Sequence, residues 1–185
     1  MTKIGCHVSI AGGLQNAPQR ATELGCEIFQ MFTRSPQGGV APKITPEIAK
    51  QFKEEMEKWE QENCHIHAPY YINFASSNKA IRSASARVVR EELERGSLVG
   101  AKYVMFHPGS AKDMDRADAL KITAEGVARV MKGYTGTTEL LLEISAGAGN
   151  VIGSTFEELE YLMEKCGSDD VNICLDSAHM FASGY

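Results

Sequence analysis

The chain has 185 residues, of which 43% are hydrophobic and 23% charged, so it can form one domain with a substantial core and is too short to suggest two. No apolar run approaches the ~20 residues of a membrane span, and the segment 1–9 lacks the features of a signal peptide; we therefore expect a cytoplasmic protein without membrane contact. The formal net charge of -5 argues weakly against binding nucleic acid through a basic face, although bound divalent cations would supply positive charge where carboxylates cluster.

Short β-rich runs alternate with five amphipathic helical segments. The runs are nearly continuous in apolar residues, which is typical of parallel strands buried on both faces. This alternation predicts βαβ units and a parallel sheet, either doubly wound or in a TIM barrel. Neither a GxGxxG motif nor a P-loop follows any run, which removes the commonest nucleotide-binding version of the doubly wound fold. The six predicted strands are Lys3–Ser9, Glu27–Thr33, His65–Asn73, Lys102–His107, Glu139–Ile144 and Val171–Asp176.

Apolar residues recur at helical spacing in three of the segments between the strands. This pattern predicts helix surfaces that face the core, and we assign these residues no catalytic or binding role. Thr45-Pro46 is a helix start signal, Ser154-x-x-Glu157 reads as a capping box, and Gly25 marks a helix end. The three stripes are Leu14, Ala17, Ala21 and Leu24; Ile48, Phe52, Met56 and Trp59; and Phe156, Leu159, Met163 and Cys166.

The five cysteines form no CxxC pair and no spacing typical of a disulfide framework. Four lie in or beside apolar strand-like runs, and the other ends a helical pattern, so we expect buried, reduced thiols. They are Cys6, Cys26, Cys64, Cys166 and Cys174.

Metal-capable side chains fall at or near the carboxyl ends of the predicted strands. In a barrel these ends converge on one mouth, where residues distant in sequence can share a metal. A carboxylate such as Glu143, which ends an apolar strand, is costly unless it is paired or coordinated. Mixed His, Asp and Glu ligation suits zinc, with manganese or iron as alternatives. The residues are His7, His67, His107, Glu143, Asp176 and His179, whereas His65 lies deeper on its strand and is not expected to join them.

Four sequence blocks resemble the endonuclease IV family of zinc-dependent abasic-site endonucleases (AP endonuclease family 2), and the resemblance extends through the whole chain. The Asp-x-x-His of the last block, followed by an aromatic residue, small residues and Gly-Tyr, is its most specific part. The blocks are GCHVS at Gly5–Ser9, HAPYYIN at His67–Asn73, FHPGS at Phe106–Ser110 and DSAHMFASGY at Asp176–Tyr185.

The resemblance implies a TIM barrel that holds three zinc ions at its mouth, of which about six βα units would be present here in one incomplete domain over residues 1–185. His67, His107 and Glu143 would hold the first zinc, with Glu143 bridging to the second. Asp176 would bind the second zinc and His179 the third. The family's other ligands would lie beyond Tyr185, so we expect about one well-held zinc site, and an impaired enzyme with a tendency to self-associate.

The reaction implied is hydrolysis of the phosphodiester bond 5′ to an abasic site in duplex DNA, together with trimming of blocked 3′ ends; Glu143 and Asp176 would be its catalytic carboxylates. Tyr70 and Tyr71 would enter the minor groove, or else pack under their loop, and His7 would face the metals or the DNA. The family's base-stack arginine is replaced here by Gln37, while Arg34 could contact a phosphate.

Two other functions remain open from the sequence. A sugar isomerase or epimerase of the xylose-isomerase-like barrels also carries His, Glu and Asp at its strand ends, but the FHPGS and DSAHMFASGY blocks favour the nuclease. A chain that keeps one metal and binds DNA without turnover would share the fold and differ only in activity.

Overall fold

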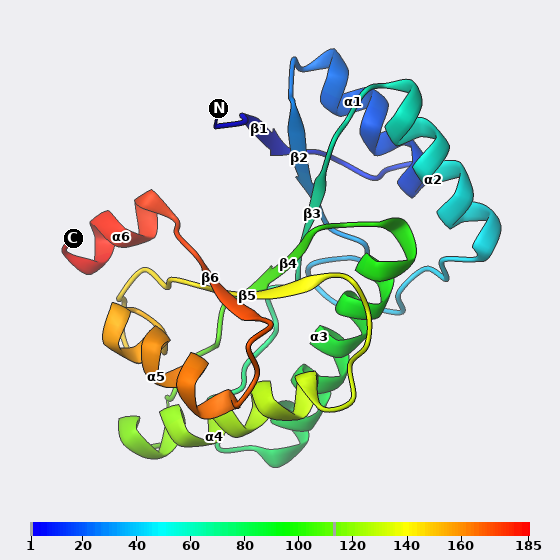
Figure 1. Ribbon diagram of the computed structural model, residues 1–185. Coiled ribbons are helices and arrows are strands. Elements are labelled where there is room, and N and C mark those ends of the chain that lie inside the picture. The colour runs from blue at the N-terminus through cyan, green and yellow to red at the C-terminus, as the bar shows by residue number, and fades with distance from the viewer. Residues whose placement is uncertain (1, 113) are drawn as a thin grey trace. The chain divides into compact units, whose positions relative to one another are not determined.

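A computed structural model describes residues 2–112 and 114–185 and contains one six-stranded sheet (Figure 1). The strands follow one another in chain order, β1-β2-β3-β4-β5-β6, and the β1–β2, β2–β3 and β5–β6 pairs are parallel. This order confirms the predicted succession of six βα units. The strands are β1 (Gly5–His7), β2 (Ile28–Met31), β3 (Cys64–His67), β4 (Tyr103–Phe106), β5 (Glu139–Glu143) and β6 (Val171–Cys174).

In the part of the chain that the structure describes, five α-helices connect consecutive strands and a sixth follows β6. Among the residues described, no helix is both long enough and apolar enough to cross a lipid bilayer. The helices are η1 (Leu14–Asn16, a 3-10 turn), α1 (Ala17–Glu23), α2 (Pro46–Lys58), α3 (Lys79–Val99), α4 (Arg116–Met131), α5 (Phe156–Cys166) and α6 (Ser177–Ser183).

The strands are shorter than predicted, above all β3. It ends at His67, whereas the predicted strand continues to Asn73. The strand stops there because Pro69, two residues further on, cannot donate a backbone hydrogen bond to a neighbouring strand. The apolar pattern of the sequence nevertheless continues beyond this point. The residues from Tyr70 to Asn78, just before α3, form a loop.

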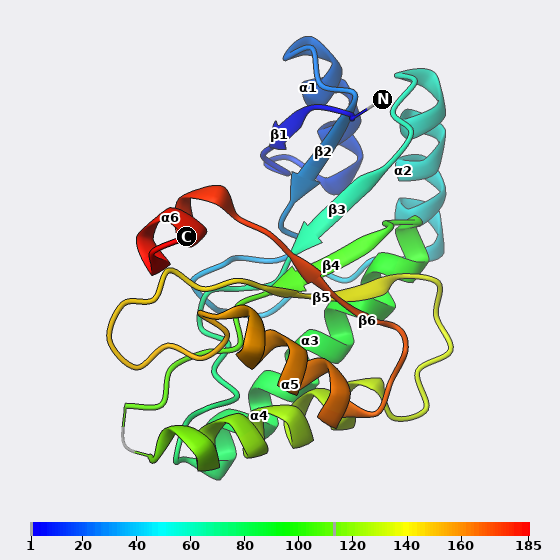
Figure 2. The ribbon, with the colours of Figure 1, turned by 60° about the vertical axis from the view of Figure 1, so that its left-hand side comes forward.

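The chain divides into two compact units, and the first comprises Met1–Pro69, Glu92–Val104 and Gly136–Thr138. Its α2 begins as predicted: Thr45 caps the helix by accepting a hydrogen bond from the Ile48 amide, and Pro46 follows. The helix buries Phe52 against Phe29 of β2, with ring centroids 6.4 Å apart. β2 and β3 run side by side in this unit (Figure 2).

The second unit comprises Tyr70–Glu91, Met105–Thr135 and Glu139–Tyr185. Helices α4 and α5 pack side by side in it (Figures 1 and 2). The predicted capping box of α5 is wrong by one residue: the cap is Thr155, whose hydroxyl accepts from the amide of Glu158. Glu158 turns back to accept hydrogen bonds from the amides of Gly153 and Ser154, so Ser154 lies before the helix. The local Ser-x-x-Glu and Thr-x-x-Glu patterns overlap, and only the chain path distinguishes them.

Candidate metal centre

Four of the predicted metal ligands lie together in the second unit. His107 directly follows β4 and Glu143 is the last residue of β5. Asp176 immediately precedes α6 and His179 lies in its first turn. β5 and β6 are paired in parallel, with Glu143 opposite Cys174, so their carboxyl ends meet at one edge of the sheet. The parallel topology therefore gathers residues that are up to 72 positions apart, His107 to His179.

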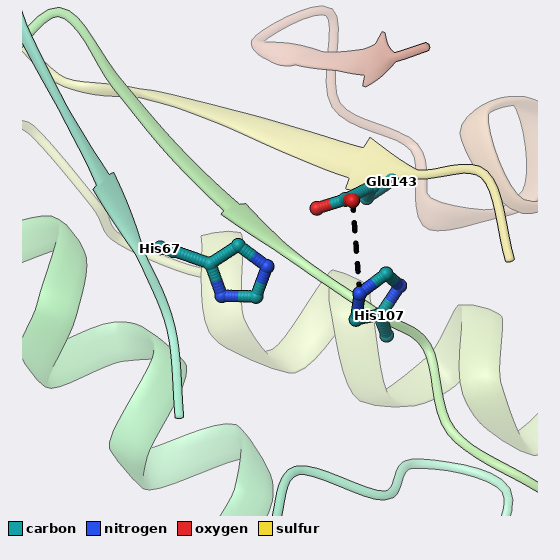
Figure 3. Close-up of side chains that lie close together, drawn as sticks. All are labelled: His67, His107 and Glu143. Carbon is teal, nitrogen blue, oxygen red and sulfur yellow. Dashed lines mark ion pairs between the residues drawn. The ribbon is translucent and has the colours of Figure 1, made fainter. Parts of the chain in front are cut away.

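The Glu143 carboxylate is the centre of this group. Its side chain is buried, and its Oε1 lies 3.6 Å from Nε2 of His107 and 3.6 Å from Nδ1 of His179. Figure 3 shows the Glu143 and His107 side chains facing each other. The imidazole rings of His107 and His179 have their centroids 5.0 Å apart. A buried carboxylate is costly unless opposite charge compensates it, which protonated imidazoles or a cation between these groups would do.

Asp176 and His179 are oriented by backbone hydrogen bonds. Oδ1 of Asp176 accepts from the amide of His179 at 2.7 Å, which caps α6. Nδ1 of His179 lies 2.9 Å from the carbonyl oxygen of Ile144. Because a carbonyl can only accept, Nδ1 carries the proton and donates it, and the lone pair of the neutral ring is then on Nε2. A carbonyl that fixes the tautomer in this way is typical of metal-binding histidines.

This donor set fits a transition metal. One ligand atom from each of Glu143, Asp176 and His179 lies within 4.8 Å of the other two. Two carboxylates and imidazole nitrogens are a usual set for zinc or manganese. Burial, and then the charges of Glu143 and Asp176, raise the pKa of the Cys174 thiol to about 11, so this neighbour is a protonated thiol at neutral pH.

His67 belongs to the first unit, where it ends β3. It is buried, and its Nδ1 lies 2.6 Å from the carbonyl oxygen of Ala68, which assigns the proton to Nδ1 and the lone pair to Nε2, as in His179. Its ring packs edge-on against Phe32, with centroids 5.7 Å apart. His67 is also labelled in Figure 3, and its sharing of a metal with His107 and Glu143 stays a prediction. His65, expected outside the group, packs its ring against Tyr103 instead.

The loop that carries His107 is tied to the loop after β3 by Asn73. The Asn73 Oδ1 accepts from the amide of Ser110 at 3.0 Å, and its Nδ2 donates to the Ser110 carbonyl at 3.1 Å. The Phe74 amide adds a bond to the carbonyl of Pro108 at 3.0 Å. Gly109 has φ +114, and a Cβ there would lie 2.2 Å from Asn73 Oδ1. Asn73 stands in the HAPYYIN block, but no pattern in the sequence predicts this role for it.

The predicted DNA-facing residues are all accessible. Tyr70 is 66% exposed and Tyr71 40%, so neither packs beneath its loop as the alternative interpretation required. His7 is exposed in the first unit, with its Nδ1 2.8 Å from Oε1 of Gln30 and its ring 4.5 Å from that of Phe32. Their contact with DNA remains a prediction.

Arg34 does not have the role that the sequence suggested. Its side chain is 5% exposed and forms an ion pair with Glu92, whose side chain is 0% exposed. The hydroxyl of Thr33 donates to the same carboxylate, and Arg95 lies 3.7 Å from it. Arg34 is therefore an internal residue of the first unit rather than a surface cation for phosphate.

The burial predicted for the cysteines holds for Cys64 and Cys166 but is wrong for Cys6, which is exposed; Cys26 and Cys174 are intermediate. All five are free thiols. Cys6 occupies a short strand in which all three residues are exposed.

Comparison with known proteins shows the family to which a chain with this fold belongs. Residues 18–185 match the family described as "Xylose isomerase-like TIM barrel", and the chain belongs to that family. Within it, the chain is 35% identical to a probable endonuclease 4 of Aquifex aeolicus over 100% of its own length and 66% of the relative's. It is 34% identical to the probable endonuclease 4 of Halothermothrix orenii, over 99% of this chain and 66% of that protein.

The solved structures agree. The crystal structure of endonuclease IV from Thermus thermophilus matches 100% of this chain and 66% of that chain, with a TM-score of 0.88 and 31% identity. A D-tagatose 3-epimerase-like protein matches 96% of this chain and 66% of its own, with a TM-score of 0.73 at 19% identity, which shows the fold alone. The resemblance to endonuclease IV inferred from the motifs is confirmed, and the chain spans about two thirds of these relatives' length.

Proposed function

We propose that the chain is part of a DNA-repair endonuclease that hydrolyses the phosphodiester bond 5′ to abasic sites in duplex DNA and trims blocked 3′ ends. The observation that carries the proposal is the buried Glu143 carboxylate, with His107, Asp176 and His179 around it at the strand ends. The 35% identity to a probable endonuclease 4 over the whole chain supports it. In this proposal residues 1–185 belong to one TIM-barrel domain and act in the cytoplasm.

The proposed metal ligands are divided among three zinc sites, as the family resemblance implies. His67, His107 and Glu143 hold the first, Glu143 and Asp176 belong to the second, and His179 to the third. Manganese is the alternative that the same donors accept. Bound cations would make a water molecule acidic enough to attack near neutral pH and would neutralise charge on the phosphate.

The chain's own groups then have distinct tasks. Glu143 and Asp176 are the catalytic carboxylates and would hold the cations at the reacting phosphate. The Ile144 carbonyl keeps the His179 proton on Nδ1, which would leave the lone pair of Nε2 for a metal ion. Asn73 holds the His107 loop through its two hydrogen bonds to Ser110. Such fixed supports are needed because ligand misplacement of about 1 Å costs activity.

In this proposal the exposed aromatic residues contact the DNA. Tyr70 and Tyr71 present large, partly polar side chains that suit the minor groove of bent DNA, and His7 adds a polar contact. An abasic nucleotide is extruded from the duplex at lower cost than an intact one, which makes it the favoured substrate. The net charge of -5 is offset locally when the carboxylates hold divalent cations.

The alternative, a metal-dependent sugar isomerase or epimerase, is less well supported. The epimerase-type structures share the fold at 13% to 19% identity, whereas the endonuclease structure matches at 31% with a higher TM-score. Function on a shared fold is decided by the site and not by the barrel.

The test is to load the purified chain with zinc or manganese and to incubate it with a duplex that contains one abasic site, an intact duplex, and a panel of ketoses. The expected result is metal-dependent binding that prefers the abasic duplex, with cleavage that leaves a 3′-hydroxyl end. Asp176→Asn should lower cleavage, and Glu139→Gln, a carboxylate at the other end of β5, should leave it unchanged. Epimerisation of a ketose without any abasic preference would contradict the proposal.

A further inference from the structure

Two cysteines that are 20 positions apart meet in the first unit. Cys6 is the middle residue of β1, and Cys26 lies in the turn between α1 and β2. Their Sγ atoms are 3.5 Å apart. In a disulfide the sulfur atoms are about 2.05 Å apart, so closing the bond requires the two sulfur atoms to approach by about 1.5 Å. Nothing in the metal centre or the proposed reaction uses this pair.

Backbone hydrogen bonds hold both cysteines in place. The Glu27 amide donates to the Ile4 carbonyl at 2.9 Å, which sets the residues next to Cys26 beside those next to Cys6. The Cys26 amide donates to the carbonyl of Ala21 at 2.9 Å, and its own carbonyl accepts from the Gln61 side chain at 2.8 Å. The short sulfur–sulfur distance therefore follows from the fold of β1 and β2.

The pair is also open to reagents. Cys6 is exposed and Cys26 is partly exposed, whereas Cys64 and Cys166 are buried. The hydrogen bond with Cys26, and then slight burial, raise the pKa of the Cys6 thiol above its usual value. The Cys6 thiol is therefore protonated near neutral pH, and its oxidation needs a thiol-reactive partner and time.

We propose that Cys6 and Cys26 are a redox modification site, which closes to an intramolecular disulfide when the chain meets a low-molecular-weight disulfide such as oxidised glutathione. The Cys6 thiolate attacks one sulfur of the reagent, forms a mixed disulfide and releases one thiol. The Cys26 thiolate then attacks Sγ of Cys6 and releases the second thiol. Two protein thiols are oxidised, one reagent disulfide is reduced to two thiols, and the protons pass to the released thiolates.

The disulfide fastens β1 to the start of β2. β1 is only three residues long, and all three residues are exposed. A covalent link across the segment 6–26 reduces the freedom of the unfolded chain, so the oxidised form is the more stable one. His7, the next residue after Cys6, is held on the same strand.

The experiment incubates the reduced full chain with oxidised glutathione for several hours and counts free thiols after denaturation. We expect two of the five thiols to disappear, a peptide map in which Cys6 is linked to Cys26, and full reversal by dithiothreitol. The melting temperature of the oxidised form should rise by about 5–10 °C.

Three variants make the assignment specific. Cys6→Ser and Cys26→Ser should each prevent the crosslink, and Cys26→Ser should stop at the mixed disulfide on Cys6. Cys166→Ser removes a buried thiol that is far from the pair in the sequence, and this variant should form the Cys6–Cys26 disulfide as the unmodified chain does. A map with only mixed disulfides, only crosslinks between chains, or a different cysteine pair would overturn the proposal.

Discussion

Nε2 of His107 lies 3.6 Å from Oε1 of Glu143, and the carboxylate that it faces is buried. His107 directly follows β4 and Glu143 ends the next strand, β5, so the two residues are 36 positions apart in the sequence. At this distance they attract each other only when the imidazole is protonated or when a cation lies between them. The first prediction depends on this relationship.

Glu143→Gln should weaken zinc binding by at least about 10–100-fold, because it replaces the carboxylate shared by the proposed ligands. The metal-free variant should be as stable as the unmodified chain or more so, since it no longer buries an ionised group. Zinc should therefore raise the melting temperature of the unmodified chain and not that of the variant. A competition titration with a chelating dye and thermal melts with and without zinc measure both effects.

The matched control is Glu139→Gln, at the opposite end of the same strand and on the same face. Its side chain accepts a hydrogen bond from Asn172 and lies outside the metal group. Zinc should therefore raise the melting temperature of Glu139→Gln as it does that of the unmodified chain. An equal loss of zinc affinity in both variants would contradict a metal site at Glu143.

Gly109→Ala should destabilise the protein by about 3 kcal/mol, since the residue has φ +114 and its new methyl group would overlap Asn73. It should also lower zinc affinity, because Asn73 holds the loop that carries His107. Gly149→Ala is the control: its φ is +61 and nothing lies within 4 Å of an added Cβ, so about 1 kcal/mol is expected without a change in zinc affinity. Denaturant unfolding and zinc titration check both variants, and similar losses in the two would argue against the Asn73 contact.

Arg34→Ala should destabilise the protein by about 3–5 kcal/mol, because it leaves the fully buried Glu92 carboxylate without its main cation. Arg87→Ala, which removes an exposed ion pair with Glu91, should cost at most about 1 kcal/mol. Urea unfolding of both variants measures the difference. If Arg34 instead contacted a DNA phosphate, Arg34→Ala would keep the stability of the unmodified chain and would lose affinity for DNA in a salt-dependent manner.

Alkaline pH should destabilise the protein partly through Cys64. Burial raises the pKa of this thiol from 9.0 to about 12 in the folded state. The folded form therefore keeps a proton that the unfolded chain loses, so the stabilisation is complete below pH 9.0 and is lost as pH rises toward 12, by at most about 1.4 kcal/mol per pH unit.

Cys64→Ala removes this titration and also a packed side chain. We expect the unmodified chain to be more stable than the variant at pH 8, and the gap in unfolding free energy to narrow between pH 9 and 10.5. Unfolding in denaturant at several pH values measures the gap. A gap that stays constant over this range would show that Cys64 does not titrate as its burial requires.

Much of the fold and the positions of the candidate ligands could be read from the sequence. Apolar runs such as Tyr103–Phe106 and helix start signals such as Thr45-Pro46 are local features, and their order along the chain dictates the strand order because short βαβ connections place consecutive strands side by side. The predicted cap of α5 is wrong by one residue because two overlapping capping patterns fit the local sequence equally well. The predicted β3 is too long because the apolar pattern continues past Pro69.

The sequence by itself determined that metal-capable side chains, His107, Glu143 and Asp176 among them, lie at or within two residues of the carboxyl end of a strand, and so at one edge of the sheet. That follows from chain direction, since all parallel strands finish at the same edge. Only the tertiary structure decided that Arg34 is buried against Glu92, that the Ile144 carbonyl orients His179, and that Cys6 and Cys26 are in contact. These relationships depend on distances of a few ångströms between residues 20 to 58 positions apart, and no periodicity along the chain encodes such distances.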